Sequence, residues 1–450
     1  MSLNTSNAVY DARTLGTPRM LVLGIQHMFA MFGATVLVPA LTGLSVSSTL
    51  LFAGLGTLLF HLLTKWKVPA FLGSSFAFIG GYAAIAPMLP DANGNASVPN
   101  TEMLPYACFG VVCAGLLYVV LAGLFVSFGT KRVMRYFPPI VTGPVIISIG
   151  LTLSKTAIDS CRANWGIALV AIAVVVGCNI WGRGMIKIIP ILLGVIASYL
   201  VAALTNNVDF SGVIAADWLG FPFRLEDTMF GLFSRPDLDK GMLLTSAVTI
   251  MPLALATMVE HIGGICAISS TCKRNYLQDP GLHRTLLGDG LATSLAALFG
   301  APANTTYGEN TGVLALSRVY DPRVIRIAAC LAILLSFSPK FAALVSAMPT
   351  ATMGGVSMVL YGMISAVGVR NIVENQVDFT NSRNVIIAAI IMVLAIGVNY
   401  SGSVVFSLGG VEVSLSGLAV AAIAGILLNA VLPGKDYEFR ADLDDGATEE

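Results

Sequence analysis

Fourteen apolar segments follow one another along nearly the whole chain. A helix needs about 20 apolar residues to cross the hydrocarbon core of a bilayer, and most of these segments approach or exceed that length. Hydrophobic residues make up 56% of the 450 residues and charged residues only 11%, whereas soluble proteins carry about 25% charged residues. Most of the surface must therefore face lipid, and the sequence predicts an all-α polytopic membrane protein.

The segments form two sets of seven, separated by a polar stretch. The first set lies near 20–40, 47–64, 70–87, 104–128, 137–154, 165–182 and 186–205, and the second near 242–268, 285–299, 301–317, 324–338, 348–369, 384–401 and 413–432. Several are short or interrupted, which is typical of backbone that lines a cavity at membrane depth. We predict short extended breaks in segments 3 and 10.

The positively charged residues test this count. With the N-terminus in the cytoplasm, the inside loops hold nineteen of the 25 Lys and Arg residues. This is the bias that the positive-inside rule predicts. We therefore expect both termini to be cytoplasmic, including the acidic tail Asp442–Glu450, which we expect to be disordered.

The two halves share short patterns. Phe137-Pro138 precedes Gly143 at the spacing at which Met348-Pro349 precedes Gly354, and Pro69-Ala70 has a counterpart in Pro302-Ala303. An odd number of segments in each half gives the halves opposite orientations, so these patterns indicate an inverted repeat. Such repeats place the substrate near the bilayer midplane, between broken helices.

Composition argues against several other functions. The formal net charge is zero, so no basic patch suggests nucleic-acid binding. The seven cysteines show no CxxC and no metal-ligand spacing, and we interpret them as packing residues. We expect no metal, no cofactor and no enzymatic activity.

Four ionisable side chains inside apolar segments are functional candidates, because burying such groups in a membrane is costly. They are Glu260, Asp289, Glu309 and His27. Glu260 is either a structural hydrogen-bonded acid or a functional group, which would be a ligand anchor or a proton carrier. Asp289 lies near a segment end, so we expect a solvated or capping role at least as much as proton transfer. His27 either makes a polar contact or relays protons, and His261 should face a neighbouring helix.

Glu309 follows a stretch that is poorly suited to a continuous helix, since it contains Pro302, Gly308 and several hydrogen-bonding residues. We predict an extended segment that turns into a half-helix, whose free N–H groups attract carbonyl oxygens and anions. The counterpart at 73–78 supplies a second opening. There Phe76 or Phe78 either stacks on a flat ligand or simply packs.

Two acids, backbone donors and an aromatic ring suit a planar, neutral ligand that carries both N–H groups and carbonyls, such as a nucleobase. A sulfate or bicarbonate transporter could share the architecture, but two unpaired acids would repel its substrate. An intramembrane aspartyl protease also needs two membrane acids, but Leu286 stands where its Gly-x-Gly-Asp motif requires the first glycine. A passive channel would not explain broken helices that carry lone acids.

The motifs resemble the nucleobase–ascorbate transporter family, and within it the bacterial uracil carriers. The residues that carry the resemblance are Gln26–Pro39, Pro69–Phe78, Glu260–Gly263, Asp279–Arg284 and Asn304–Gly312. They extend over nearly the whole chain apart from the tail and parts of the outer loops. The resemblance implies proton symport of uracil into a bacterial cell across the cytoplasmic (inner) membrane, with a xanthine or urate carrier on the same fold as the alternative.

The resemblance also implies two domains, a core that holds substrate and a gate through which the protein forms a homodimer. The expected boundaries are 1–18 for the N-terminal tail, 19–128 and 242–338 for the core, 129–206 and 339–432 for the gate, 207–241 for an outer loop and 433–450 for the tail. Transport would proceed by movement of the core against the gate. Gly354 and Gly355 are expected where the two slide, because small side chains let helices approach closely.

Site residues follow from the same resemblance. Glu260 and Glu309 match the acids that hold ring N–H groups, and Phe76 and Gly308 match positions whose backbone amides meet a carbonyl oxygen. Ala34 matches a ring-packing position, Tyr361 lies on the gate wall, and Ser75 and Tyr307 flank the substrate positions. Xanthine and urate carriers typically have Gln where Glu309 stands.

One departure concerns the proton. Gly264 stands where a relative has a histidine linked to proton coupling. This shifts the expected proton role to Glu260, Glu309 or Asp289, with His27 as a further candidate. A second departure, Ser317 in place of a threonine, keeps the hydroxyl group.

Overall fold

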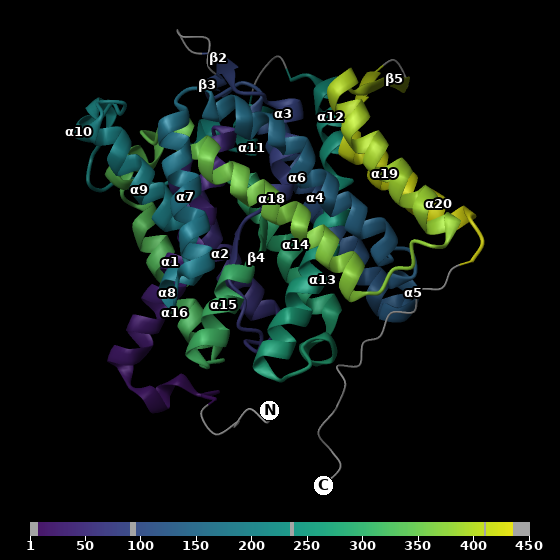
Figure 1. The fold of residues 1–450 in the computed structure, drawn as a ribbon, viewed down its shortest axis with the longest axis horizontal. Helices are drawn as coiled ribbons and strands as arrows, with labels where there is room; N and C mark the ends of the chain where they lie inside the picture. The colour runs from purple at the N-terminus through teal and green to yellow at the C-terminus, as the bar shows by residue number, and fades with distance from the viewer. Residues whose placement is uncertain (1–7, 91–95, 235–237, 409–410, 435–450) are drawn as a thin grey trace.

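The computed structural model describes residues 8–90, 96–234, 238–408 and 411–434 and is predominantly helical (Figure 1). The longer helices of the first half are α1 (Thr17–Thr42), α2 (Val46–Leu63), α4 (Leu104–Phe128), α6 (Pro139–Cys161), α7 (Trp165–Trp181) and α9 (Pro190–Leu204). Those of the second half are α12 (Lys240–Ile250), α13 (Leu253–Cys272), α14 (Leu282–Leu298), α15 (Gly308–Ser317), α16 (Pro322–Ser336), α18 (Thr350–Glu374), α19 (Ser382–Ser401) and α20 (Gly417–Val431). Short helices are α3 (Ile79–Ile85), α5 (Thr130–Met134), α8 (Met185–Ile188), α10 (Ser211–Ala215), α11 (Met229–Phe233) and α17 (Pro339–Ser346).

Length and hydropathy identify the chain as a multi-pass membrane protein. Seven spans within the described residues are long and apolar enough to cross a bilayer, one of them formed by α12 and α13 together. The bent pair α16 and α17, which meet at 88°, forms an eighth candidate, and α3 (with its preceding turn), α7, α9 and α20 are shorter apolar helices. The predicted all-α membrane class is therefore confirmed.

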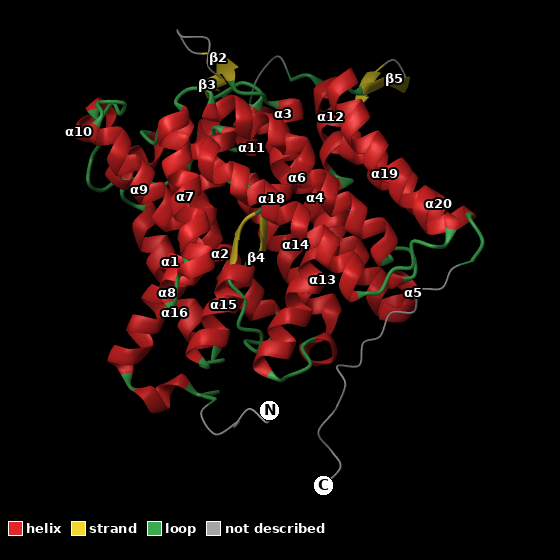
Figure 2. Cartoon of the chain, viewed as in Figure 1, coloured by secondary structure: helices red, strands yellow, loops and turns green. Residues whose placement is uncertain are grey.

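The predicted extended breaks are present and cross each other. Strand β1 (Leu72–Ser74) precedes α3, and strand β4 (Asn304–Thr306) precedes α15. The strands pair antiparallel, with Leu72 opposite Thr306 and Ser74 opposite Asn304. Figure 2 shows this short strand pair in the middle of the helices. Pairing satisfies backbone groups that have no water to bond at membrane depth.

Helix packing repeats between the two halves of the chain. Helix α4 packs on α14 as α2 packs on α16, and α7 packs on α9 as α19 packs on α20. Helix α18 likewise contacts α7 as α6 contacts α19, and the most extensive contact joins α6 to α18. When each predicted segment of the first half is matched with the segment seven places later in the chain, each of these helix contacts in one half corresponds to a contact in the other.

Two small hairpins depart from the predicted helical pattern. Strand β2 (Leu89–Pro90) pairs with β3 (Ala96–Val98), and β5 (Val404–Leu408) pairs with β6 (Val411–Leu415). The segment predicted at 413–432 therefore becomes helical only at Gly417. The hairpin β5–β6 that precedes this helix contains Val404, Val405, Val411 and Val413, and β-branched residues favour strands. The hairpins lie at the same end of the molecule in Figure 2.

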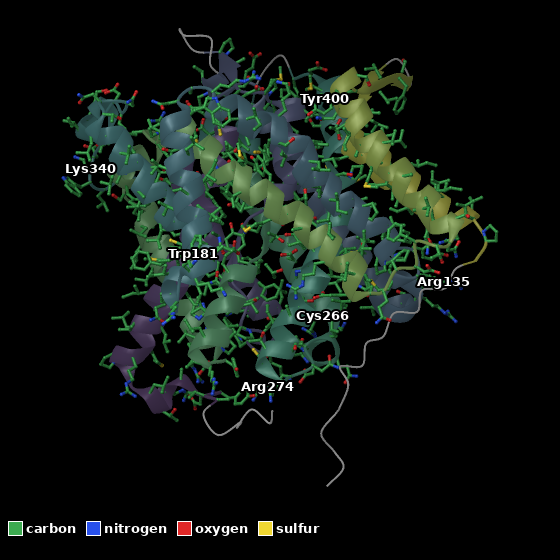
Figure 3. All side chains as sticks on the ribbon, in the orientation of Figure 1. Arg135, Trp181, Cys266, Arg274, Lys340 and Tyr400 are labelled. Atoms are coloured by element: carbon green, nitrogen blue, oxygen red, sulfur yellow. The ribbon has the colours of Figure 1, made fainter. Side chains whose placement is uncertain are left out.

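The charged residues labelled in Figure 3 separate along the molecule. Arg135 and Arg274 lie in the lower half of the view, whereas Lys340 lies in the upper half. The predicted topology assigns Arg135 and Arg274 to the cytoplasmic side and Lys340 to the opposite side. Which end of the molecule is cytoplasmic stays a prediction. The acidic tail predicted to be disordered lies outside the described residues.

Connections at the Arg274 end are held by polar contacts. The backbone N–H of Ala12 donates to Asp321 Oδ2 at 2.7 Å, and the Tyr10 hydroxyl donates to the Cys272 carbonyl oxygen at 3.0 Å. Lys67 pairs with Asp279 in the turn before α14. The hydrogen bond from the Lys67 ammonium lowers the pKa of the Asp279 carboxyl group from its ordinary value.

Candidate functional site

The crossing of β1 and β4 positions two half-helices. Beyond the paired residues, the Ser75 N–H donates to the Ala303 carbonyl oxygen at 2.8 Å, and the Tyr307 N–H donates to the Phe71 carbonyl oxygen at 3.0 Å. These bonds extend the pairing at both ends. They satisfy the backbone up to the point where each half-helix begins.

The Tyr307 side chain fastens the crossing to α1. Its hydroxyl donates to the Ser74 carbonyl oxygen at 2.8 Å and lies 3.1 Å from Ser74 Oγ and 3.3 Å from Thr35 Oγ1. Ser74 Oγ in turn donates to the Thr35 carbonyl oxygen at 3.0 Å. Tyr307 therefore has a structural role. The sequence predicted only that it lies beside the substrate.

Asn304 and Thr57 anchor the two strands to the surrounding helices. Asn304 Nδ2 donates to the Phe52 carbonyl oxygen on α2 at 3.0 Å, and Thr293 Oγ1 on α14 donates to the Asn304 carbonyl oxygen at 2.9 Å. Thr57 Oγ1 donates to the Leu72 carbonyl oxygen at 3.1 Å and accepts from the Leu72 N–H at 2.9 Å. Sequence analysis did not single out these side chains, although polar groups within apolar segments were the available signal.

Phe76 and Gly308 occupy the first positions of the two half-helices. The first N–H groups of a helix have no partner within the helix, so both amides remain donors toward the space beyond the crossing. Gly308 is exposed, and a Cβ atom placed there would meet nothing within 4 Å. Phe76 is half-buried against the hydrophobic core. Both predicted amide positions thus border the same crossing.

Glu260 and Glu309 approach this crossing from different helices. Glu260 on α13 is exposed, whereas Glu309 in the first turn of α15 is half-buried. The two carboxyl groups are close enough to interact electrostatically. A Cβ atom at Gly264, one turn after Glu260, would lie 2.9 Å from Thr306 Oγ1 in β4. Helix α13 therefore lies directly against the crossing.

The face of α13 that carries Glu260 is open. Gly263, Ala267 and Ser270 are exposed on the same helix, at the three- and four-residue spacing of one helical face. Gly263 has open space where its Cβ atom would lie. An exposed face of small residues thus runs from Glu260 toward the end of α13 that carries Arg274.

His27 makes the polar contact that was one of its two predicted roles. Asn310 Nδ2 donates to the His27 carbonyl oxygen at 3.0 Å and lies 3.2 Å from His27 Nδ1. Both side chains are buried. This contact ties α15 to α1. Asn310 lies within the motif Asn304–Gly312, but this contact was not predicted.

Asp289 is not solvated, and the interpretation of this residue as a solvated or capping group is wrong. Its side chain is 0% exposed and lies 3.4 Å from His261 Nδ1, measured to Asp289 Oδ2. His261 is also 0% exposed and faces α14, as predicted. The end of the apolar segment had suggested exposure, but α14 extends from Leu282 to Leu298 and Asp289 lies well within it.

The predicted gate residues are buried against neighbouring helices. A Cβ atom at Gly354 would lie 2.6 Å from the Cys161 backbone nitrogen, and one at Gly355 would lie 2.4 Å from the Ala168 carbonyl oxygen. Gly354 therefore packs against the C-terminal end of α6, and Gly355 packs against α7. The prediction that these glycines form a sliding surface toward the core is wrong. Tyr361 is 1% exposed and does not border open space.

The remaining predicted site residues, Ala34 and Ser75, are buried at the crossing. The Ala34 carbonyl oxygen lies 3.4 Å from Ser74 Oγ. Ser75 contributes its backbone N–H to the crossing, and its Oγ has no hydrogen-bond partner among the described residues. Ser75, Phe76, Tyr307, Gly308 and Glu309 are therefore brought together by the strand pair.

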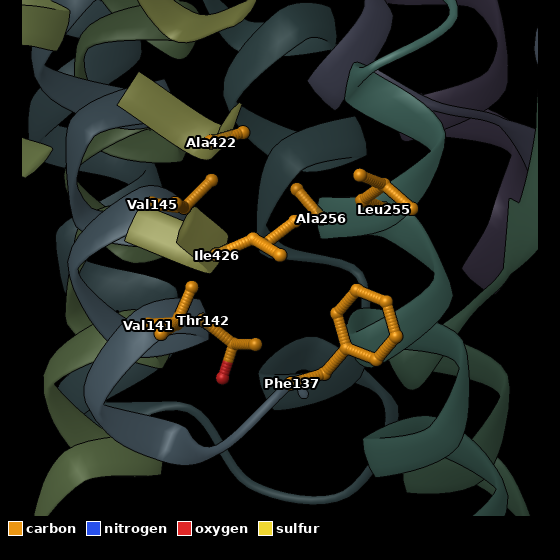
Figure 4. Close-up of a pocket in the computed structure, with 8 residues that line it drawn as sticks. All are labelled: Phe137, Val141, Thr142, Val145, Leu255, Ala256, Ala422 and Ile426. Atoms are coloured by element: carbon orange, nitrogen blue, oxygen red, sulfur yellow. The ribbon is translucent and has the colours of Figure 1, made fainter. Parts of the chain in front are cut away.

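A separate apolar crevice lies between α6, α13 and α20 (Figure 4). It is lined by Phe137, Val141, Thr142, Val145, Leu255, Ala256, Ala422 and Ile426. The predicted acids do not line it.

Residues 18–403 match the model described as Permease family. The chain belongs to this family. Its relatives are named as permeases and not as enzymes, which confirms the prediction that the protein is a transporter.

Several curated relatives are similar over nearly their full length. The chain is 42% identical to a uracil permease of Bacillus caldolyticus, over 95% of this chain and 94% of the relative. It is 40% identical to a uracil permease of Bacillus subtilis, over 91% of both chains. A putative pyrimidine permease of Escherichia coli is 38% identical over 92% of this chain and 89% of the relative.

Solved transporters share the fold at low sequence identity. The transmembrane domain of the cyanobacterial bicarbonate transporter BicA superimposes with a TM-score of 0.53 at 16% identity, over 93% of this chain and 99% of that domain. The structure of SLC26A9 gives a TM-score of 0.64 at 12% identity, over 94% of this chain and 66% of that protein. From the sequence, a bicarbonate transporter could share the architecture, and the fold is shared.

Proposed function

We propose that this permease imports uracil together with protons across the bacterial cytoplasmic membrane. The observation that carries the proposal is the convergence of Glu260 and Glu309 on the openings of two crossed half-helices. The carboxylates would accept the ring N–H groups, and the amides of Phe76 and Gly308 would donate to a carbonyl oxygen. The Phe76 ring would lie against the planar face of the ligand. The uracil permeases among the relatives support this substrate.

The charge of the site favours a neutral ligand over an anion. No Lys or Arg forms an ion pair with Glu260 or Glu309 within the described part of the chain. Two carboxyl groups without a nearby cation would repel a bicarbonate or sulfate ion. The shared fold with anion transporters therefore does not extend to a shared substrate in this proposal.

For the architecture, we propose fourteen segments in two inverted repeats of seven. The matched helix pairs and the antiparallel crossing of β1 and β4 support it. The core would comprise 19–128 and 242–338, and the gate 129–206 and 339–432. Both termini would be cytoplasmic. The exposed apolar side chains of α19 and α20, among them Val393 and Leu427, would face lipid or a second copy in a homodimer.

Transport would follow from movement of the core against the gate. The core carries both acids and both half-helices, so the whole site would cross the barrier as one body. Coupling requires that uracil binding and proton binding favour each other, because a ligand shifts an equilibrium only by its differential affinity for the two states. A proton bound equally with and without uracil would drive nothing.

The test is uptake of labelled uracil by liposomes that contain the purified protein. An inward proton gradient should drive accumulation, a lower external pH should increase it, and a protonophore should abolish it. Unlabelled uracil should compete, whereas xanthine should not. A protein that only equilibrates uracil would be a facilitator, and preferential competition by xanthine would reassign it to the purine carriers.

A further inference from the structure

A buried histidine and aspartate lie together behind the two substrate acids. His261 on α13 and Asp289 on α14 are both 0% exposed, and Nδ1 of the histidine lies 3.4 Å from Oδ2 of the aspartate. His261 directly follows Glu260, and successive residues of a helix differ in direction by about 100°. Glu260 therefore faces the open side of α13 while His261 faces the interface with α14.

Neither member of the pair has another polar partner. Both carboxyl oxygens of Asp289 and both ring nitrogens of His261 lack a hydrogen bond to any described residue. Their 3.4 Å approach is within ion-pair distance but does not form an aligned hydrogen bond. A buried carboxylate that is neither paired nor hydrogen-bonded is strongly disfavoured. The arrangement therefore needs a proton, either on the imidazole or on the carboxyl group.

Other titratable groups surround the pair, and among the described residues no Lys or Arg forms an ion pair with Asp289. Glu260 of α13 and Tyr118 of α4 are close enough to Asp289 to interact with it electrostatically. The Tyr118 hydroxyl is occupied by a hydrogen bond to Thr257 Oγ1 at 2.6 Å. From α2, the Phe60 ring meets the His261 ring edge-on at 6.2 Å, and the adjacent His61 points Nε2 at the Ala70 carbonyl oxygen, 2.9 Å away.

We propose that His261 and Asp289 hold one proton between them and form the proton-binding site of the transport cycle, in place of the imidazole that position 264 lacks. The inference rests on the proposed uracil symport. It identifies a group that binds the proton without touching uracil. The two substrate acids then remain free to accept hydrogen bonds from the ring.

The link to uracil would run through Glu260. Like charges repel strongly in a medium of low dielectric constant, so an ionised Glu260 favours the protonated form of the pair. Uracil donates an N–H group to Glu260 and thereby stabilises its ionised form. Uracil binding would therefore strengthen proton binding at the pair, and by reciprocity proton binding would strengthen uracil binding. The proton would enter from the outside and leave to the cytoplasm with uracil.

The experiment compares two activities of the Asp289→Asn variant in liposomes. Asparagine imitates the neutral carboxyl group in size but does not titrate. Uracil exchange without a gradient should persist, whereas accumulation driven by a proton gradient should be lost. For one proton per uracil, the wild type should accumulate uracil about tenfold per pH unit of gradient, since one pH unit is one factor of ten in proton concentration. His261→Gln should give the same result.

His61→Gln is the matched control, because His61 is also buried but contacts a backbone carbonyl oxygen and not a carboxyl group. It should keep gradient-driven accumulation. Exchange-competent Asp289→Asn or His261→Gln protein that accumulates uracil with the wild-type pH profile would overturn the inference. If Asp289→Asn does not fold, His261→Gln decides, because loss of either member removes the shared site. A wild type that does not accumulate uracil would instead overturn the symport proposal.

Discussion

The Tyr307 hydroxyl donates a 2.8 Å hydrogen bond to the carbonyl oxygen of Ser74. Tyr307 is the residue immediately before α15, and Ser74 is the last residue of β1. One side chain thus joins the start of one half-helix to the strand that leads into the other. The relative position of the two openings depends on this bond as well as on the backbone pairing.

Replacing Tyr307 with Phe should therefore loosen the crossing. An unsatisfied buried acceptor costs about 1–3 kcal/mol. We expect a lower unfolding temperature in detergent and weaker uracil binding, because the amides of Phe76 and Gly308 lose their fixed separation. Tyr400→Phe is the control, since Tyr400 is exposed at the end of α19. Unchanged stability and affinity in Tyr307→Phe would show that the backbone pairing alone positions the openings.

Glu260→Gln should cripple uracil binding. The substitution keeps the size of the side chain but replaces one acceptor oxygen with a donor, which opposes the ring N–H group. Loss of a hydrogen bond to a charged group costs about 1.5–3 kcal/mol, equivalent to roughly a 10- to 150-fold weaker affinity. Binding of labelled uracil to purified protein measures it. Near-normal affinity would remove Glu260 from the site.

Glu309→Gln should weaken uracil binding and permit xanthine binding, because it introduces the residue type that the family resemblance associates with purine carriers. Competition by xanthine against labelled uracil measures the change. The same competition with Glu374→Gln is the control, since Glu374 lies at the end of α18 in an exposed pair with Arg370. Specificity that is the same in Glu309→Gln as in the wild type would contradict the role assigned to Glu309.

The extended breaks could be predicted from the sequence because their cause is local. Proline, glycine and hydrogen-bonding side chains around 302–309 disfavour a continuous helix wherever the segment lies. The same holds for 73–75. That the two breaks pair with each other was not predictable in this way, because the register of Leu72 opposite Thr306 joins residues more than 200 positions apart.

Asp289 and Gly354 show the limit of the same approach. Their hydropathy context indicates depth along a segment but not which neighbouring helix each side chain meets. Asp289 was expected near solvent but faces His261. Gly354 was expected between core and gate but packs against the C-terminal end of α6. Both errors concern rotation about a helix axis, which long-range packing determines.

Gly355→Ala should destabilise the protein while Gly362→Ala should not. A Cβ atom at Gly355 would lie 2.4 Å from the Ala168 carbonyl oxygen, whereas one at Gly362 meets nothing within 4 Å. Overpacking costs about 1–3 kcal/mol, but Gly to Ala in an open helix interior gains about 0.5–1 kcal/mol. Thermal unfolding in detergent should separate the two variants. Equal unfolding temperatures would mean that α7 and α18 can separate without cost.

Gly264 and Thr306 should be energetically coupled. A Cβ atom at Gly264 would lie 2.9 Å from Thr306 Oγ1, so alanine requires this side chain to move. Gly264→Ala alone combines two opposing effects, because alanine also favours the helix. A double-mutant cycle with Thr306→Ala isolates the contact. Thr306 Oγ1 has no hydrogen-bond partner among the described residues, so its removal should cost little by itself.

We expect a coupling free energy of about 0.5–3 kcal/mol, the range found for residues in contact, with the double variant more stable than the two single effects predict.

Removing the Thr306 side chain should also make room for a histidine at position 264. Gly264→His combined with Thr306→Ala should bind uracil better than Gly264→His alone, and its accumulation should depend on pH differently from that of the wild type. A coupling energy near zero would place α13 farther from β4 than the structure does. Loss of proton-driven accumulation in the stable double variant would show that an imidazole at 264 interferes with the proton route.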